Sequence, residues 1–156
     1  FWRSYKVDCE NILLQSRTAT WIKWHFQSKI DKGTAWIISF NDNDQLLGYA
    51  VCSDTSNDNI NLKRISLVDL VSLKDSEEIY LSLVKKCLIE AKRRGYHAVE
   101  LVGYKNLKRK IFSEFKPFKR KLIFPFFYKS RNKIYENFLK KNEIWDLSLI
   151  DGDAFL

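Results

Sequence analysis

A single carboxylate stands in an otherwise apolar stretch of this 156-residue chain. Residues 65–73 read Ile-Ser-Leu-Val-Asp-Leu-Val-Ser-Leu, which is the composition of a buried strand, and Asp69 carries the only charge. A carboxylate among apolar side chains can take a proton from an amine, as general base catalysis requires. The alternative is a structural carboxylate that pairs with a lysine or arginine, as buried charges usually do. The sequence leaves both interpretations open.

The strand leads into a helix whose acidic start decides which ligands it can bind. Residues 76–94 carry apolar side chains at helical spacing, and Asp75 or Ser76 can cap the first turn, which also holds Glu77 and Glu78. A helix N-terminus binds phosphate through free backbone N–H groups and the positive end of its dipole. Here three carboxylates can occupy that field instead. The pattern favours an acid-capped helix that binds no anion.

Other elements must position these residues. From hydrophobic periodicity and turn residues we expect, in order, helices within 1–27, strands at 34–40 and 45–53 joined by a turn at 41–44, a strand at 62–73, the helix 76–94, a strand at 96–102, a short helix at 106–115, an aromatic strand at 118–129, a short helix at 134–141 and a last strand at 145–150. With no repeat or linker, this order predicts one α/β domain over 1–156, with a mixed, mostly antiparallel sheet flanked by helices.

Positive charge is concentrated in one part of the chain. Lys105–Lys141 holds thirteen basic and two acidic residues, whereas the net charge of the whole chain is +8. Lysines and arginines interleaved with aromatic residues, as in residues 119–133, are typical of surfaces that bind single-stranded nucleic acid or an anionic membrane. The same composition also suits a core-facing aromatic strand with lysines outside, which protect a sheet edge. We therefore regard nucleic-acid binding through Lys105–Lys141 as possible but not favoured.

Cysteine and histidine usage argues against a metal site. Cys9, Cys52 and Cys87 are scattered and odd in number, which predicts free thiols, a reducing compartment and so a cytoplasmic protein. His25 and His97 are too few for a histidine-based site, and we expect no metal. No apolar run approaches the roughly 20 residues of a membrane span. The sequence has no methionine, so we expect it to begin inside a longer chain that supplies a further N-terminal strand.

Several short motifs occur in an order that resembles one superfamily. They are Gly48–Val51 (GYAV), Glu90–Gly95 (EAKRRG), Asn106, Phe118, Trp21–Phe26 (WIKWHF) and Trp145 followed by Asp151–Asp153 (DGD). Their order and spacing resemble the GNAT (Gcn5-related N-acetyltransferase) superfamily over nearly the whole chain. The WIKWHF motif and the C-terminal combination of Trp145 and DGD resemble a divergent bacterial branch of this superfamily.

The resemblance implies an acyl-CoA N-acyltransferase fold and an activity. The implied reaction moves an acyl group from acetyl-CoA or another acyl-CoA to an amine on a small molecule or peptide, and Asp69 would be its base. A splayed central strand would offer backbone N–H groups to the pantetheine arm, and the following helix start would hold the pyrophosphate. The implied donor-binding residues are Leu70, Val71, Ser72, Ser76, Glu77, Glu78, Ile79 and Asn106.

This sequence departs from the family pattern where the chemistry lies. The family's (Gln/Arg)-x-x-Gly-x-(Gly/Ala) phosphate loop falls on residues 75–80, where Asp75 replaces the basic residue and Glu78 and Tyr80 replace the glycines. Ser113 stands where many members have the tyrosine that protonates the leaving thiolate, and a serine is a poor acid. In one variant of the acyltransferase hypothesis, the acyl group comes from another activated donor, such as an aminoacyl-tRNA. The competing hypothesis is a non-catalytic GNAT-like module that has lost CoA binding and binds a partner protein or an anionic polymer.

Overall fold

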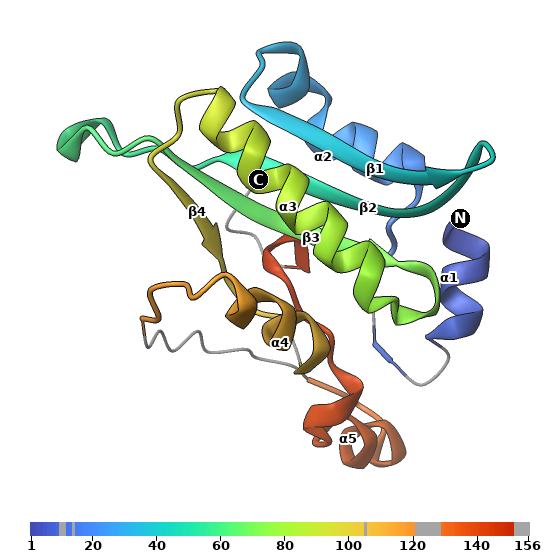
Figure 1. The fold of residues 1–156 in the computed structure, drawn as a ribbon. Coiled ribbons are helices and arrows are strands. Elements are labelled where there is room, and N and C mark those ends of the chain that lie inside the picture. Colours follow the sequence, from blue (N-terminus) through green and yellow to red (C-terminus); the bar gives the residue numbers. More distant parts are fainter. Residues whose placement is uncertain (10–11, 14, 105, 121–128, 152–156) are drawn as a thin grey trace.

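The computed structural model describes residues 1–9, 12–13, 15–104, 106–120 and 129–151. Its centre is a four-stranded sheet in the order β1-β2-β3-β4 (Figure 1). The strands are β1 Ala35–Asp42, β2 Gln45–Asp54, β3 Arg64–Ser72 and β4 Ala98–Leu101. The first three strands pair antiparallel, and β3 and β4 pair parallel. This is the mixed, mostly antiparallel sheet that the sequence predicted.

Helices cover both faces of this sheet. On one face lie α1 Trp2–Asp8 and α2 Ala19–Asp31, and on the other lies α3 Glu77–Arg93, with α4 Asn106–Glu114 beside it (Figure 1). Near the C-terminus comes α5 Lys133–Leu139. The described residues also form the short 3₁₀ helices η1 Asp58–Ile60, η2 Leu73–Asp75, η3 Asn142–Ile144 and η4 Leu149–Asp151. In the described part of the chain, no helix has the length and apolar character needed to cross a membrane.

Two apolar cores form, one on each face. The larger packs Leu83 and Cys87 of α3 and Ile111 of α4 against the sheet. The smaller packs Tyr5 of α1 and Phe26 of α2 against the opposite face. These layers follow from the alternation of side chains along the strands and the apolar stripe of α3.

Local signals set most of the element boundaries. The two-residue turn between β1 and β2 places Asn43 at φ 44° and Asp44 at φ 65°, a left-handed conformation that these two residue types tolerate. The Oγ atom of Ser76 accepts a hydrogen bond from Ile79 N at 3.4 Å, which starts α3 where the capping pattern predicted. The side chain of Thr18 caps α2 by accepting a hydrogen bond from Trp21 N.

Three expectations differ from the structure or lie outside it. The last strand, expected at 145–150, is wrong, because this segment forms η4 and isolated bridges such as Gly103–Ser148. The strand expected at 96–102 is shorter, Ala98–Leu101, and its side chains are half-buried or exposed. The aromatic strand expected at 118–129 falls mostly on residues 121–128, outside the described residues.

Candidate active site

The central strands diverge next to the predicted base. Residues 64–67 of β3 pair with residues 98–101 of β4. Beyond Leu67, β3 continues to Ser72 without pairing to β4. A β-bulge lies at the same place, because Leu67 and Asp69 face the adjacent residues Cys52 and Val51 of β2. A bulge adds one residue and increases the local twist of the strand. We call the point after Leu67 the fork.

Tyr104 fills the base of the fork. Its hydroxyl donates to the carbonyl oxygen of Leu67, the last paired residue of β3, at 2.9 Å, and the ring is buried. Tyr104 has φ 62°, a strained conformation for a bulky residue, and Gly103 before it has φ 83°. A Cβ atom on Gly103 would lie 2.7 Å from the carbonyl oxygen of Leu147, so this backbone requires glycine. Burial, and next the charge of Asp69, raise the pKa of Tyr104 well above its usual value.

Asp69 lies on the α1–α2 side of the fork and belongs to a buried ion-pair network. Arg17, in the loop before α2, donates through Nε to both carboxylate oxygens of Asp69 at 3.0 and 3.1 Å. The Tyr49 hydroxyl donates to Asp69 Oδ2 at 2.9 Å. Arg17 also donates through Nη2 to Asp151 Oδ2 at 2.8 Å. Only 1% of Asp69 and 4% of Arg17 are exposed, so this is a charge network inside the protein.

The network raises the pKa values of Arg17 and Tyr49. Burial lowers the pKa of the Arg17 guanidinium, but the charges of Asp69 and Asp151 outweigh this and raise it. Burial and the Asp69 carboxylate raise the pKa of Tyr49, so its hydroxyl stays a donor. One guanidinium and two carboxylates leave a net charge of −1. Asp69 is thus an ion-pair partner, as the structural interpretation predicted, and it lies beside the fork; its role as a base stays a prediction.

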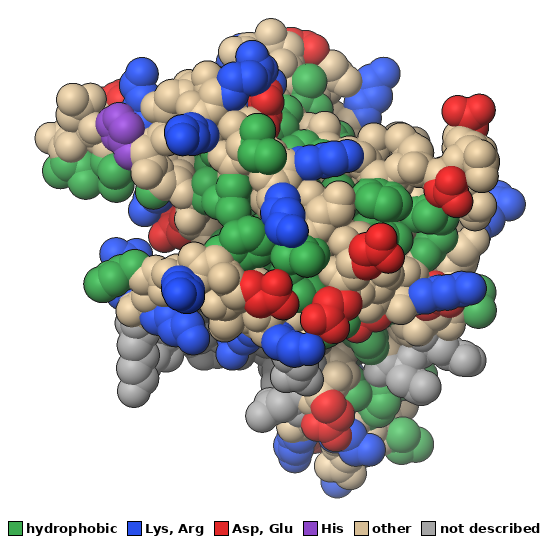
Figure 2. Space-filling model, in the orientation of Figure 1, with side chains coloured by type: hydrophobic (Ala, Val, Ile, Leu, Met, Phe, Trp, Pro, Cys, Tyr) green, Lys and Arg blue, Asp and Glu red, His purple; other side chains and the backbone are tan. Residues whose placement is uncertain are grey.

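Acidic side chains surround the start of α3. The Lys74 amide donates to Asp8 Oδ2 at 3.0 Å, and the Ser76 amide donates to Ser72 Oγ at 3.2 Å. Asp75 accepts a 2.6 Å hydrogen bond from the Tyr80 hydroxyl. Figure 2 shows further carboxylates on this face, in the region between α3 and α4. The backbone amides of Lys74, Ser76 and Ile79 therefore already have side-chain acceptors.

The same region lacks the space that a phosphate loop needs. Glu77 and Glu78 lie exposed in the first turn, and Glu77 pairs with Lys110 of α4 at 3.2 Å. Tyr80, at a family glycine position, is completely buried. A nucleotide pyrophosphate would meet carboxylates where it needs cations and side chains where it needs bare backbone. The residues of the α3 start do not fit the pyrophosphate of acyl-CoA.

The other residues that were predicted to bind the acyl donor have different surroundings. Leu70 packs toward α3 and Val71 toward α1 and α2, so their side chains belong to the two cores. Asn106 begins α4. Ser113 lies exposed on α4, where its hydroxyl donates to Arg109 O at 2.9 Å, so the structure does not bring it to the fork.

Sequence reasoning missed Arg17, Tyr49 and Lys108. Lys108 of α4 is only 6% exposed, pairs with Asp146 at 2.7 Å and lies 5.5 Å from the ring centroid of Tyr80. It thereby occupies the space between the starts of α3 and α4. None of the three carried a signal, because a lone arginine in a loop, a tyrosine in a strand and a lysine in a basic helix are all ordinary. Asp151 was noted only within the DGD motif.

A hollow lined by described residues lies away from the fork. It encloses about 400 Å³ between β1 and α3, at the opposite edge of the sheet from β4. The Arg94 guanidinium stacks on Trp36 there, 4.2 Å from the ring centroid. Because no catalytic group of the fork reaches this edge, we do not assign it to the site. The described residues also contain no cluster of three or more metal-ligating side chains.

Comparison with known proteins reveals the fold through structure rather than sequence. No protein-family model and no curated protein matches the sequence. A ribosomal-protein-alanine N-acetyltransferase from Brucella melitensis biovar Abortus 2308 is similar in structure, with a TM-score of 0.60 and 11% identity over 82% of this chain and 91% of that one. A predicted acetyltransferase from Clostridium acetobutylicum, solved with acetyl-CoA, has a TM-score of 0.60 and 13% identity over 81% and 91%.

A third similar structure has a different acceptor. It is an aminoglycoside acetyltransferase from an uncultured soil metagenomic sample, in complex with sisomicin, with a TM-score of 0.61 and 12% identity over 83% of this chain and 85% of that one. At such identities the likeness is one of fold. The chain has the fold of the GNAT acetyltransferases, as its motifs predicted.

Proposed function

We propose that this chain is an N-acyltransferase of the GNAT type, which moves an acyl group from an activated donor to the amine of a small molecule or peptide. The observation that carries the proposal is the fork, where β3 leaves β4 beside a buried carboxylate and a buried tyrosine. An amine acceptor also fits the similar proteins, one of which is an aminoglycoside acetyltransferase.

Asp69 and its partners would handle the acceptor. A protonated amine is attracted by the net negative charge of the Arg17, Asp69 and Asp151 network. It can replace the weakest donor to Asp69, the Ser148 hydroxyl at 3.4 Å, and then pass its proton to the carboxylate. Tyr104 keeps its proton and remains a hydroxyl donor at the base of the fork. Arg17 would hold Asp69 in place throughout.

The proposed base can be tested by replacing Asp69 with asparagine. We expect Asp69→Asn to lower kcat for amine acylation by about 10²–10⁴-fold and to change the pH–rate profile, because the amide cannot accept the proton. The measurement is initial rate against pH, at a temperature where the variant stays folded. Asp58→Asn, in the η1 loop, is the matched control and should keep wild-type rates. An unchanged rate and pH profile in Asp69→Asn would assign the base to another group.

An acyl-CoA is the default donor of this fold and supplies the acyl group as a thioester, although the α3 start does not fit its pyrophosphate. We expect acetyl-CoA to raise the Tm no more than S-acetyl-pantetheine, which lacks the nucleotide, because the pyrophosphate gains nothing from the carboxylates around α3. Glu77→Gln/Glu78→Gln should increase the acetyl-CoA shift alone. A much larger shift with acetyl-CoA in the unmodified protein would show that α3 binds the nucleotide after all.

The second candidate is a non-catalytic GNAT-like module that binds a partner. It is favoured by one observation: the polar groups of Arg17, Tyr49 and Tyr104 beside the fork already form hydrogen bonds within the protein. If neither thioester changes the Tm and no amine is acylated, this second function is the better description.

A further inference from the structure

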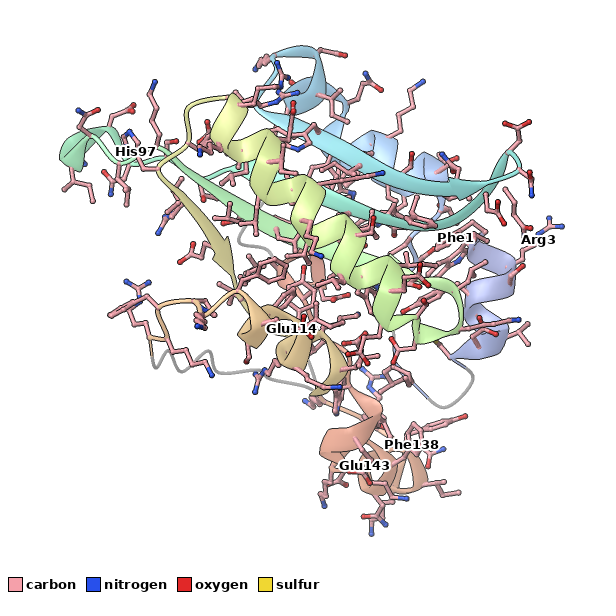
Figure 3. All side chains as sticks on the ribbon, in the orientation of Figure 1. Phe1, Arg3, His97, Glu114, Phe138 and Glu143 are labelled. Atoms are coloured by element: carbon pink, nitrogen blue, oxygen red, sulfur yellow. The ribbon has the colours of Figure 1, made fainter. Side chains whose placement is uncertain are left out.

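An apolar surface is exposed on α5, away from both cores. Ile134 is 78% exposed, Tyr135 61% and Phe138 36%, and their spacing places them on one side of the helix. We call residues 129–145 the α5 lobe. Figure 1 shows α5 beyond α4, away from the sheet, and Figure 3 places Phe138 in this lobe. Three large apolar side chains therefore face solvent side by side on α5.

The lobe holds this surface in a defined conformation. The side chain of Asn132 caps α5 by accepting from Ile134 N at 2.9 Å. At the other end, the Trp145 indole donates to the carbonyl oxygen of Leu139 at 2.9 Å. Glu136 and Lys140 form an ion pair one turn apart at 3.2 Å. The apolar side chains are therefore presented by a capped helix and do not belong to a frayed end.

Basic residues flank the apolar side chains at both ends of the helix. Lys129 and Arg131 precede α5, and Lys140 and Lys141 follow it. With Lys133 and the acidic Glu136 and Glu143, the residues from 129 to 143 carry a net charge of +3. A short apolar face between cations is complementary to a surface that is anionic outside and apolar beneath.

The size of the face indicates which kind of partner fits. A seven-residue helix is about 10 Å long and about 10 Å wide, so one side of it offers on the order of 100 Å². A stable protein partner needs about 800 Å² from each side. A lipid surface has no such minimum, because a few inserted side chains and several cations act together with many lipids.

We propose that the α5 lobe docks the protein reversibly on an anionic phospholipid surface. Ile134, Tyr135 and Phe138 enter the boundary between headgroups and acyl chains, and the flanking lysines and arginine lie at the level of the lipid phosphates. The inference does not depend on acyl transfer, since the lobe uses no residue of the fork. It places whatever reaction or binding the fork supports at a membrane surface.

Vesicle binding tests the proposal with the full chain. We expect the protein to co-sediment with vesicles of 70% phosphatidylcholine and 30% phosphatidylserine. Binding to pure phosphatidylcholine should be at least tenfold weaker, and 0.5 M NaCl should release the protein because the charges are exposed. Binding that does not distinguish the two vesicles, or no binding, would overturn the proposal.

Matched variants separate insertion from charge. Ile134→Asp/Tyr135→Asp should weaken binding at least tenfold with an unchanged Tm, because both side chains are mostly exposed. Ile60→Asp and Ile89→Asp, at similarly exposed positions outside the α5 lobe, should bind as wild type does. Lys129→Glu/Arg131→Glu should also weaken binding, and Lys92→Glu/Arg93→Glu on α3 should not. If single-stranded RNA binds instead, and the charge variants but not the aspartate variants abolish that binding, the lobe is a nucleic-acid surface and the proposal fails.

Discussion

Replacing Arg17 by methionine should lower the free energy of unfolding by about 3–5 kcal/mol. Methionine fills much of the same space but removes the only cation that contacts both Asp69 and Asp151 in the described network. Two carboxylates then stay in the interior without a counter-charge, which is far more costly than the loss of a surface pair. For a chain of this length, the Tm should fall by roughly 6–20 °C.

Chemical denaturation with an exposed control checks this prediction. Arg93→Met breaks the pair between Arg93 and Glu90 on the surface of α3, and it should leave the urea midpoint almost unchanged. Adding Asp69→Asn to Arg17→Met should recover part of the lost stability, because one of the unpaired charges disappears. Equal effects of Arg17→Met and Arg93→Met would mean that solvent reaches the network.

The second large effect is expected at Gly48 of β2, below the start of α3. A Cβ atom there would lie 2.6 Å from Ile79 Cγ2 and 2.9 Å from the carbonyl oxygen of Val71. Gly48→Ala should therefore lower the free energy of unfolding by about 1–3 kcal/mol, since the helix start must move off the sheet. The measurement is again the urea midpoint.

A double-mutant cycle identifies the contact responsible. Ile79→Ala removes the side chain that the new methyl group would meet, so Gly48→Ala should cost less in that background than in wild type. The contact with the Val71 carbonyl remains, so part of the cost should persist. If the two substitutions are simply additive, the glycine is not what lets α3 start so close to the sheet.

The sequence by itself determined the elements whose signals are local. The apolar stripe and cap of α3, the Asn43–Asp44 turn and the apolar run of β3 each depend on residues a few positions apart, and all lie within about two residues of the expected boundaries. Their order then indicated the GNAT fold. The strand prediction at 145–150 was wrong for the opposite reason. These residues interact with groups far away in the sequence, as when the Ser148 hydroxyl donates a hydrogen bond to Asp69.

The candidate site was decided only by the tertiary structure. Asp69 could be recognised as unusual from its strand, but its partner Arg17 is 52 positions away in a loop without periodicity. Likewise, nothing local shows that Lys108 is buried against Tyr80 or that Tyr104 closes the base of the fork. Helices and strands form through interactions between near neighbours along the chain, and short patterns therefore predict them. A buried charge has to be neutralised by whichever group the folded chain brings to it, and that pairing exists only in three dimensions.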